Sequence, residues 1–277
     1  LWPTAFDKDG VMYTNTSFGD YPHYLADGVA DHSRSRFTGW MLLNYNKPVQ
    51  VSSTLGGYGA NNAVDEDVKT YWSAQTGNKG EWIQSDLGGL STVRALQINY
   101  ADQDADILGK AKDIYHQYMI SYSVDGKKWK VLVDKSANKT DVPHDYIHLK
   151  DPVEARYIRL ENIHMAAGKF AVSGLRVFGS GNGEKPEAVK QFLVLGSDKD
   201  RRSAWIKWSP VSNAYAYNIY FGVSPDKLYG SIMVYGSNEY YFKGMDKERS
   251  YYFAIEAINE NGVSERTRSA YLKEKFD

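Results

Sequence analysis

The feature that most restricts the fold is a series of short segments in which apolar and polar residues alternate. In residues 96–100 the apolar side chains Leu96, Ile98 and Tyr100 alternate with two polar ones. In residues 118–122 every second residue is aromatic or aliphatic, and residues 157–160 place two aliphatic side chains in the same spacing. A period of two places every second side chain on one face, as in a β-strand with one buried face. No segment of about 15 residues keeps the helical period of 3.6, and residues 104–116 indicate a loop or a single turn. The sequence therefore predicts an all-β protein.

Length and composition limit the classes of function. A chain of 277 residues favours two domains over one. The 33 Lys and Arg nearly balance the 34 Asp and Glu, so we expect no nucleic-acid partner, and the lack of a long apolar run predicts no membrane insertion. Cysteine is absent, which excludes disulfides and thiolate chemistry. The 22 tyrosines and 7 tryptophans suit half-buried strands and sugar-binding surfaces alike, and composition leaves both open.

Two polar segments mark expected domain boundaries. Residues 179–186 (GSGNGEKP) have the composition of a linker, and the polar run at residues 31–36 indicates a weaker boundary. Residues 1–37 are too few to close a sheet, so we expect a short β fragment of something larger that docks on the middle segment. The expected domains are then residues 38–180 and 181–277. Because no basic-then-apolar leader is present, we expect a mature chain or one cut from a longer polypeptide.

Five motifs in the middle segment carry a family resemblance. They are residues 62–72 (NAVDEDVKTYW), 81–88 (EWIQSDLG), 121–129 (SYSVDGKKW), 155–160 (ARYIRL) and 174–179 (GLRVFG). In this order, over about 140 residues, they resemble the discoidin, or coagulation factor 5/8 type C, domain, whose sugar-binding members include family 32 carbohydrate-binding modules. The resemblance implies a jelly-roll-like β-sandwich with its ligand site in the loops at one end.

The aromatic and glycine residues of these motifs have a structural interpretation. Trp72, Trp82 and Trp129 lie in alternating apolar contexts, so we expect them in the core and not on a ligand platform. Gly88 and Gly126 occupy turn positions that favour a positive φ. These five residues therefore predict packing and turn geometry rather than recognition.

The charged residues of the middle segment have two interpretations. Arg156 and Arg159 either neutralise carboxylates such as Asp86 or form a solvated strand face. His144 and His148 have the spacing of a helical metal site, but on a strand or loop that spacing does not place them on one helical face. We therefore expect no histidine metal site here.

The loop after residue 62 has oxygen donors at a spacing that suits a hard cation. In the resembling family it commonly holds a structural calcium, completed by a glutamate near the C-terminal strand; here Gly174 stands at the matching position. The candidate calcium ligands are Ala63, Asp65, Asp67, Thr70 and Ser173. The alternative is a turn in which Asp65 accepts backbone N–H bonds.

Three groups of loop residues are candidates for a sugar site, which needs an exposed ring and a few fixed polar groups. Tyr58 lies in a glycine-rich loop, Lys169 and Phe170 lie in a second loop, and His116 with Gln75 forms the third group. The alternative for each is packing against a neighbouring domain.

The C-terminal segment carries a second resemblance, over about 90 residues. Trp208 follows alternating apolar positions, Tyr251 lies six residues after Met245, and residues 260–262 (ENG) form a hairpin signal. This pattern resembles a fibronectin type III domain, in which Trp208 would fill the core and the Tyr251 hydroxyl would bond a backbone group. Trp205 falls on the opposite face, and we expect it to be exposed or packed on the middle domain.

The N-terminal residues suggest a parent enzyme. Residues 2–16, 18–22 and 39–45 resemble the last blade of the propeller in family 43-type glycoside hydrolases, which act as xylosidases or arabinofuranosidases. Hydrolysis needs two carboxyl groups flanking the scissile bond, and in that family they lie on earlier blades. Asp9 and Gly10 are more simply a β-turn, so we assign no catalytic residue to this chain.

These observations predict a non-catalytic glycan-binding and spacer region of a secreted glycosidase. Its expected partners are a plant-type or host glycan, xylan- or arabinan-like, and the catalytic domain of the same polypeptide. Its expected location is extracellular, periplasmic or at a bacterial cell surface. A structural calcium is its one expected cofactor. Two alternatives stay open: modules that only buttress the propeller, and an adhesion module for protein or lipid.

Overall fold

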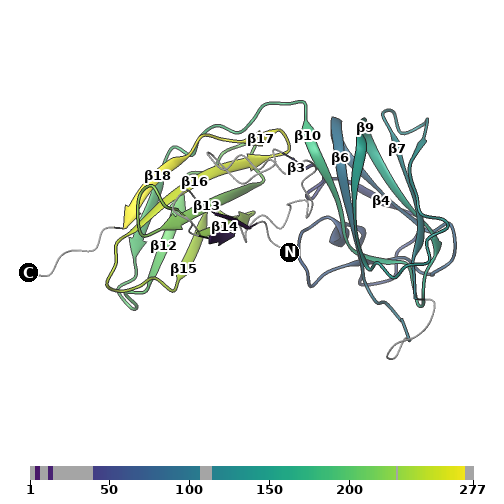
Figure 1. Ribbon diagram of the computed structural model, residues 1–277, viewed down its shortest axis with the longest axis horizontal. Coiled ribbons are helices and arrows are strands. Elements are labelled where there is room, and N and C mark those ends of the chain that lie inside the picture. Colours follow the sequence, from purple (N-terminus) through teal and green to yellow (C-terminus); the bar gives the residue numbers. More distant parts are fainter. Residues whose placement is uncertain (1–3, 7–11, 15–39, 107–113, 229, 272–277) are drawn as a thin grey trace, which may run out of the picture. The chain divides into compact units, whose positions relative to one another are not determined.

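The computed structural model describes residues 4–6, 12–14, 40–106, 114–228 and 230–271 (Figure 1). The chain divides into two compact units, one of Leu42–Asn182 and one of Leu1–Met41 with Gly183–Asp277. The division falls within the segment expected as a linker, although strand β10 continues to Gly181. Both units are built from antiparallel strands, as the alternating sequence pattern predicts. The expected propeller remnant at residues 1–37 lies almost wholly outside the described residues; only β1 (Thr4–Phe6) and β2 (Met12–Thr14), which pair with each other, belong to it.

The central unit is one bent sheet with the strand order β3-β10-β6-β9-β7-β8, where β4 pairs with β6 and β5 with β10. Its two long strands change register along their length, β6 between Asp86 and Ser91 and β9 opposite the same point. They therefore serve both halves of a jelly-roll-like sandwich. The elements are β3 (Met41–Leu42), β4 (Val49–Val51), the 3-10 helix η1 (Ala60–Ala63), β5 (Trp72–Ser73), β6 (Trp82–Tyr100), β7 (Gln117–Ser123), β8 (Lys130–Asp134), β9 (His144–His164) and β10 (Ala171–Gly181).

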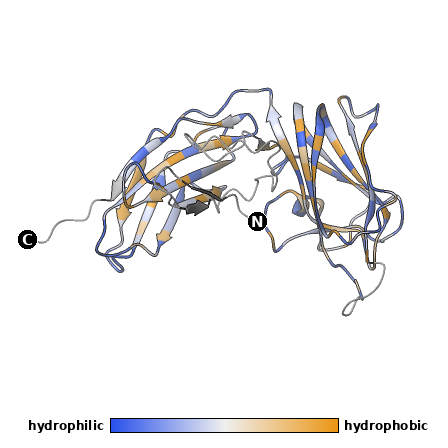
Figure 2. Cartoon of the chain, in the orientation of Figure 1, coloured by the Kyte–Doolittle hydropathy of each residue, from blue (hydrophilic) through white to orange (hydrophobic). Residues whose placement is uncertain are grey.

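The core of the central unit lies between the two halves of this sheet. The predicted inward residues Leu96, Ile98 and Tyr100 are buried, which confirms the alternation seen in the sequence. Apolar and polar residues alternate along several strands of the unit (Figure 2). The largest fully buried side chains of this unit are Trp72, Tyr118, Phe170, Phe178, Leu42, Leu43, Ile83, Leu96, Ile98 and Ile120.

Only one of the three tryptophans expected in the core is fully buried. Trp72 is 0% exposed, whereas Trp82 and Trp129 are half-buried, so the prediction is wrong for these two. Trp82 precedes the buried Ile83, and alternation along β6 places its ring on the opposite face. There the guanidinium carbon of Arg159 lies 4.5 Å from the Trp82 ring centroid and 4.3 Å from that of Trp129. The two indoles thus enclose a cation.

The two arginines of β9 make different contacts. Arg156 pairs with Asp86 as expected, Nε donating to Oδ1 and Nη2 to Oδ2, each at 2.9 Å. This hydrogen-bonded partner holds the pKa of Asp86 below its ordinary value. Arg159 instead donates to Oε1 of the buried Gln84, from Nε at 3.2 Å and from Nη2 at 2.7 Å. The expected neutralising role therefore falls to Arg156 alone.

The predicted turn glycines have the expected conformation. Gly88 has φ +82° and Gly126 φ +70°. Beside Gly126, Asp125 Oδ1 accepts the N–H groups of Lys128 and Lys127 at 2.8 Å each. These bonds lower the pKa of Asp125 to about 2. The side chain therefore stabilises the turn in its charged form.

The C-terminal unit has two antiparallel sheets, β11-β12-β15 and β14-β13-β16-β17, with β18 added to β16. Trp208 is buried and Trp205 is 41% exposed on the opposite face, as predicted. The Tyr251 hydroxyl accepts the Asp246 N–H at 2.9 Å, which confirms the predicted backbone bond, and β16 and β17 form a hairpin across residues 260–262. The strands are β11 (Phe192–Gly196), β12 (Ser203–Trp208), β13 (Ala216–Gly222), β14 (Gly230–Tyr235), β15 (Glu239–Lys243), β16 (Tyr251–Asn259), β17 (Gly262–Val263) and β18 (Thr267–Tyr271).

Candidate functional site

Loops that are far apart in the sequence meet at one end of the central unit. The backbone of Phe170 accepts the Ala74 N–H at 2.8 Å and donates to the Thr76 carbonyl at 3.0 Å. The Lys169 N–H donates to the Gln103 carbonyl at 2.9 Å. These bonds join the loops that follow β5, follow β6 and precede β10. The candidate site lies at this end, because loops held on a rigid scaffold commonly carry the binding residues of a protein.

Two tyrosine rings form its aromatic part. Tyr58 and Tyr71 are stacked with centroids 4.7 Å apart and an interplanar angle of 29°, and both are half-buried. Tyr58 closes a turn in which its N–H donates to the Leu55 carbonyl at 3.0 Å, and Gly57 in this turn has φ +89°. Tyr71 immediately precedes the buried Trp72 of β5, so the two neighbouring rings face opposite ways.

A chain of polar groups continues from the second ring. The Tyr71 hydroxyl donates to Gln103 Oε1 at 2.7 Å, and Gln103 Nε2 donates to Asp104 Oδ1 at 2.7 Å. Lys169 Nζ bonds Asp104 Oδ2. Burial, followed by the neighbouring Tyr58, raises the pKa of Tyr71 to about 12, whereas the bonds from Lys169 and Gln103 lower the pKa of Asp104. We call Tyr58, Tyr71, Gln103, Asp104 and Lys169 the tyrosine rim.

Beside the rim, Glu81 is surrounded by hydroxyl groups. Its carboxylate accepts bonds from Ser52, from Ser53 at 2.8 and 2.9 Å, and from Thr76 at 2.7 Å. Burial raises the pKa of Glu81, but the hydrogen bonds from Ser52, Thr76 and Ser53 outweigh it and the pKa is lowered. Glu81 is therefore a charged carboxylate whose position is held by these hydrogen bonds. The sequence analysis did not select Glu81. An acidic residue directly before a strand, together with a Ser-Ser pair after the neighbouring strand, is a pattern that could have indicated it.

Of the five predicted ligand residues, the structure brings Tyr58 and Lys169 into the rim. Phe170 is 0% exposed and packs edge-on against Trp72 at 5.4 Å, so the prediction that it offers an exposed ring is wrong. His116 stacks on Tyr100 at 3.9 Å, and burial lowers its pKa. Gln75 is exposed and donates its N–H to a serine hydroxyl at 3.0 Å. Tyr71 and Gln103 are rim residues that the sequence reasoning did not select.

The expected calcium ligands with polar side chains make hydrogen bonds to other groups of the protein. Asp65 accepts the Asp67 N–H at 2.9 Å and the Thr70 hydroxyl at 2.7 Å, which is the turn alternative, and Ser173 donates to a backbone carbonyl at 3.2 Å. Ala63 ends η1 and is buried. Gly174 supplies no carboxylate, and a Cβ built there would lie 2.8 Å from Asn99 Nδ2. No group of three or more His, Asp or Glu side chains within the described ranges is arranged to hold a metal ion. The residues present do not fit the calcium site that the resemblance implies.

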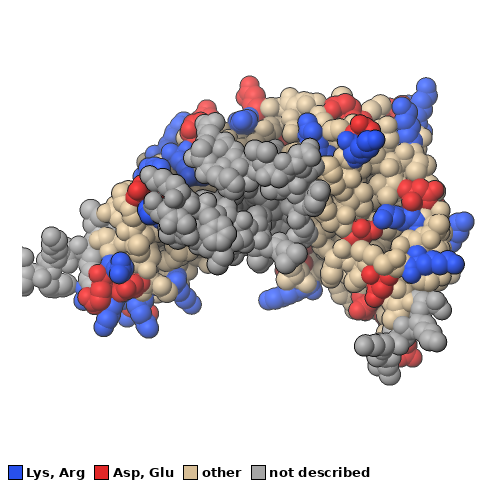
Figure 3. Space-filling model, viewed as in Figure 1, with Lys and Arg blue, Asp and Glu red and all other residues tan. Residues whose placement is uncertain are grey.

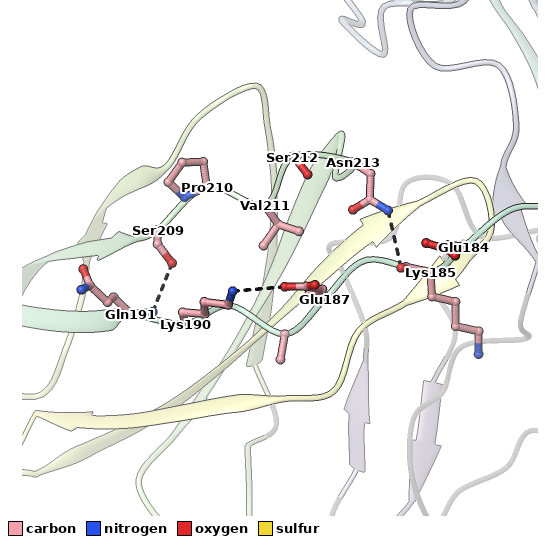
Figure 4. A pocket seen from close by; sticks show the side chains of 11 residues that line it. Glu184, Lys185, Glu187, Lys190, Gln191, Ser209, Pro210, Val211, Ser212 and Asn213 are labelled. Carbon is pink, nitrogen blue, oxygen red and sulfur yellow. Dashed lines mark hydrogen bonds and ion pairs between the residues drawn. The ribbon is translucent and has the colours of Figure 1, made fainter.

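A hollow lies within the C-terminal unit, which does not carry the tyrosine rim (Figure 4). Its volume is about 720 Å³. In its lining, Lys190 pairs with Glu187 at 3.3 Å, and Ser209 accepts the Gln191 N–H at 3.1 Å. Its lining carries no aromatic side chain among the described residues. Without a ring for stacking, this hollow suits a sugar less well than the tyrosine rim does.

Surface charge is mixed on the one face of the central unit that Figure 3 shows, where Lys and Arg alternate with Asp and Glu. Such a face gives little long-range attraction for a polyanion. In the described part of the chain, no helix has the length and apolarity that a membrane span requires.

Part of the central unit matches a known domain family. Residues 48–173 match the sequence model of a family described as "F5/8 type C domain", which supports a discoidin-type domain in this part of the chain. Mouse neuropilin-2 is 32% identical over 88 residues, which are 29% of this chain and 10% of neuropilin-2, and human neuropilin-2 is 28% identical over the same length. The chain thus spans about a tenth of the length of the curated relatives it matches.

Several solved structures are similar to about half of the chain. Chitosan-binding module 1 from a chitosanase/glucanase of Paenibacillus sp. IK-5 is 23% identical, with a TM-score of 0.43, and the match covers 50% of this chain and 99% of that one. A family 32 carbohydrate-binding module of Clostridium perfringens NanJ, solved with galactose, is 16% identical, with a TM-score of 0.41 and coverage of 50% and 98%.

Proposed function

We propose that the central unit binds a glycan through the tyrosine rim. The observation that carries this proposal is a stacked, half-exposed tyrosine pair joined to a chain of fixed polar groups at one end of a rigid sandwich. A sugar ring has an apolar face that packs on an aromatic ring and a periphery of hydroxyls that needs oriented donors and acceptors. The rim offers both within one set of loops.

Each rim residue has a distinct part in this proposal. Tyr58 stacks on the sugar face, and Tyr71 supports Tyr58 from behind. Gln103 and Asp104 keep the Tyr71 hydroxyl and the Lys169 ammonium in place, and these polar groups meet the sugar hydroxyls. Because Lys169 and Asp104 neutralise each other, we expect a neutral sugar, in line with the xylan- or arabinan-like glycan expected from the sequence.

Titration calorimetry with the purified chain tests this proposal. The probes are xylohexaose, arabinohexaose and galactose. Removing one stacking ring costs about 1.4 kcal/mol, so Tyr58→Ala should weaken binding about tenfold. Trp205→Ala is the matched control, because it also removes an exposed ring but lies in the other unit. No heat with any probe, or equal affinities for the two variants, would contradict the proposal.

We further infer that the chain is a non-catalytic part of a longer, secreted glycoside hydrolase. The sequence resemblance of residues 1–45 supports such a parent, and the two antiparallel sheets with the bond from Asp246 to Tyr251 support a fibronectin type III spacer. The chain alone should not turn over a chromogenic xyloside or arabinoside. Turnover that survives purification would instead assign the chemistry to this chain.

A further inference from the structure

One ion pair fastens the loop that lies between the two rim tyrosines. Arg176 of β10 reaches Glu66, with Nε donating to Oε1 at 2.9 Å and Nη2 bonding Oε2. The side chains are 10% and 12% exposed. Nη1 of Arg176 also bonds Oε1 of the buried Gln97 at 3.3 Å. The pair is therefore bidentate, largely shielded from solvent and supported by a third group.

Glu66 makes this contact from an uncommon backbone conformation. Glu66 has φ +61°, a left-handed conformation that a residue with a side chain adopts at a cost. The acids on either side point elsewhere, since Asp65 bonds Thr70, and Asp67 accepts the Lys69 N–H at 2.9 Å. Glu66 is thus the loop carboxylate that pairs with a cation, and that cation belongs to the chain.

We propose that the Glu66–Arg176 ion pair, and not a bound calcium ion, anchors residues 60–70 to strand β10. The guanidinium supplies the positive charge that would otherwise come from a metal, and Gly174, two residues before Arg176, leaves no carboxylate to complete a calcium site. A bidentate arginine–carboxylate pair has fixed geometry, and in a site of low exposure it is weakly screened by salt. The loop is then folded whether or not calcium is supplied.

By holding the loop, this ion pair also sets the positions of the two rim tyrosines. Tyr58 lies just before the loop and Tyr71 directly after it, so a loop that leaves β10 changes the separation of the stacked rings. Glu66 and Arg176 are therefore positioning residues for the glycan, a step that rests on the function proposed above. Breaking one half of a buried pair leaves the other charge without a partner, which makes single substitutions informative.

Calcium dependence is tested on the unaltered chain. The thermal midpoint of the central unit should be the same in EGTA and in millimolar calcium chloride. A midpoint that rises by several degrees with calcium would overturn the proposal. This measurement needs neither a variant nor a glycan.

Trypsin cleavage after the exposed Lys69 tests the anchor itself. Glu66→Gln should speed this cleavage about tenfold under native conditions, since each tenfold change in opening corresponds to 1.4 kcal/mol. Arg156→Gln is the matched control, because it breaks another bidentate pair of the same unit, one whose side chains are 42% and 22% exposed. Equal rates for the two variants would contradict the anchor. If Glu66→Gln unfolds, so that sites throughout the unit are cut, the calcium test on the unaltered chain decides.

Binding of xylohexaose separates this inference from the proposed function. Weaker binding by Glu66→Gln, together with faster cleavage at Lys69, supports the positioning role. If Glu66→Gln binds xylohexaose as well as the unaltered chain does but is cleaved faster at Lys69, the ion pair anchors the loop without positioning the rim. If the unaltered chain binds no glycan, the proposed function fails, while the calcium and cleavage results still judge the ion pair.

Discussion

Replacing Arg159 with alanine should destabilise the central unit far more than an exposed arginine would. The guanidinium lies between the Trp82 and Trp129 rings, at 4.5 and 4.3 Å, and donates twice to the buried Gln84. A cation–π contact at a half-exposed site is worth about 0.5–1 kcal/mol, and a charged hydrogen bond to a buried amide about 1.5 kcal/mol. We expect Arg159→Ala to lower the free energy of unfolding by about 3 kcal/mol.

Calorimetry and tryptophan fluorescence measure this loss. For a unit of this size, about 3 kcal/mol lowers the thermal midpoint by roughly 10 °C. The thermal midpoint of Arg159→Lys should fall between those of the unaltered chain and Arg159→Ala, because lysine keeps the charge but not the planar group. The control is Arg156→Ala, which removes a partly exposed ion pair worth about 0–1 kcal/mol. Equal losses for Arg159→Ala and Arg156→Ala would refute the reasoning, because both would then be ordinary surface arginines.

Three further predictions concern packing, a corner bond and acid stability. Phe170→Ala should lower the free energy of unfolding by about 3–5 kcal/mol, because its ring is fully buried, whereas Tyr58→Ala should lower it by about 1 kcal/mol or less. Urea unfolding of the two variants measures both values, and a small loss for Phe170→Ala would show that its ring is not part of the core. Tyr251→Phe should lower the stability of the C-terminal unit by about 1 kcal/mol and Tyr252→Phe should not, as heat denaturation would show. Because the pKa of Asp125 is about 2 in the folded state and near 4 in the unfolded state, its charged form stabilises the fold above pH 4, and this stabilisation is lost as the pH falls through about 2. The difference in unfolding free energy between the unaltered chain and Asp125→Asn should therefore shrink between pH 5 and pH 2 in urea titrations. A difference that does not change with pH would contradict this prediction.

The features that the sequence predicts correctly depend on local patterns. Alternation identifies Leu96 and Ile98 as core residues because a strand with one buried face repeats every two residues. The Tyr251 bond and the positive φ of Gly126 follow from short motifs whose geometry is nearly self-contained. Such features need no knowledge of which strands pair, and a single sequence is enough to predict them.

Features that depend on contacts across the chain are harder to predict. Trp82 and Trp129 lie 47 positions apart and become neighbours only through Arg159, so an apolar ring in an apolar segment is wrongly assigned to the core. Glu66 gives no local signal because its partner Arg176 is 110 residues away. The usual rule that aromatic rings are buried also fails for rings that can bind a cation on the face.

Two pairs of adjacent residues show how closely core and rim are interleaved. Trp72 and Phe170 are buried against each other, while their preceding neighbours Tyr71 and Lys169 both belong to the rim. In the pairing of β5 with β10, Trp72 is opposite Val172, and Phe170 directly precedes the paired segment. Residues 72–74 and 170–172 are all buried, so Tyr71 and Lys169 each lie just before a run of buried residues. This pairing is only two residues long. Substitutions that weaken it should therefore alter the rim without touching any rim residue, and recognition at this end depends on this short strand pairing as well as on the identity of the exposed rings.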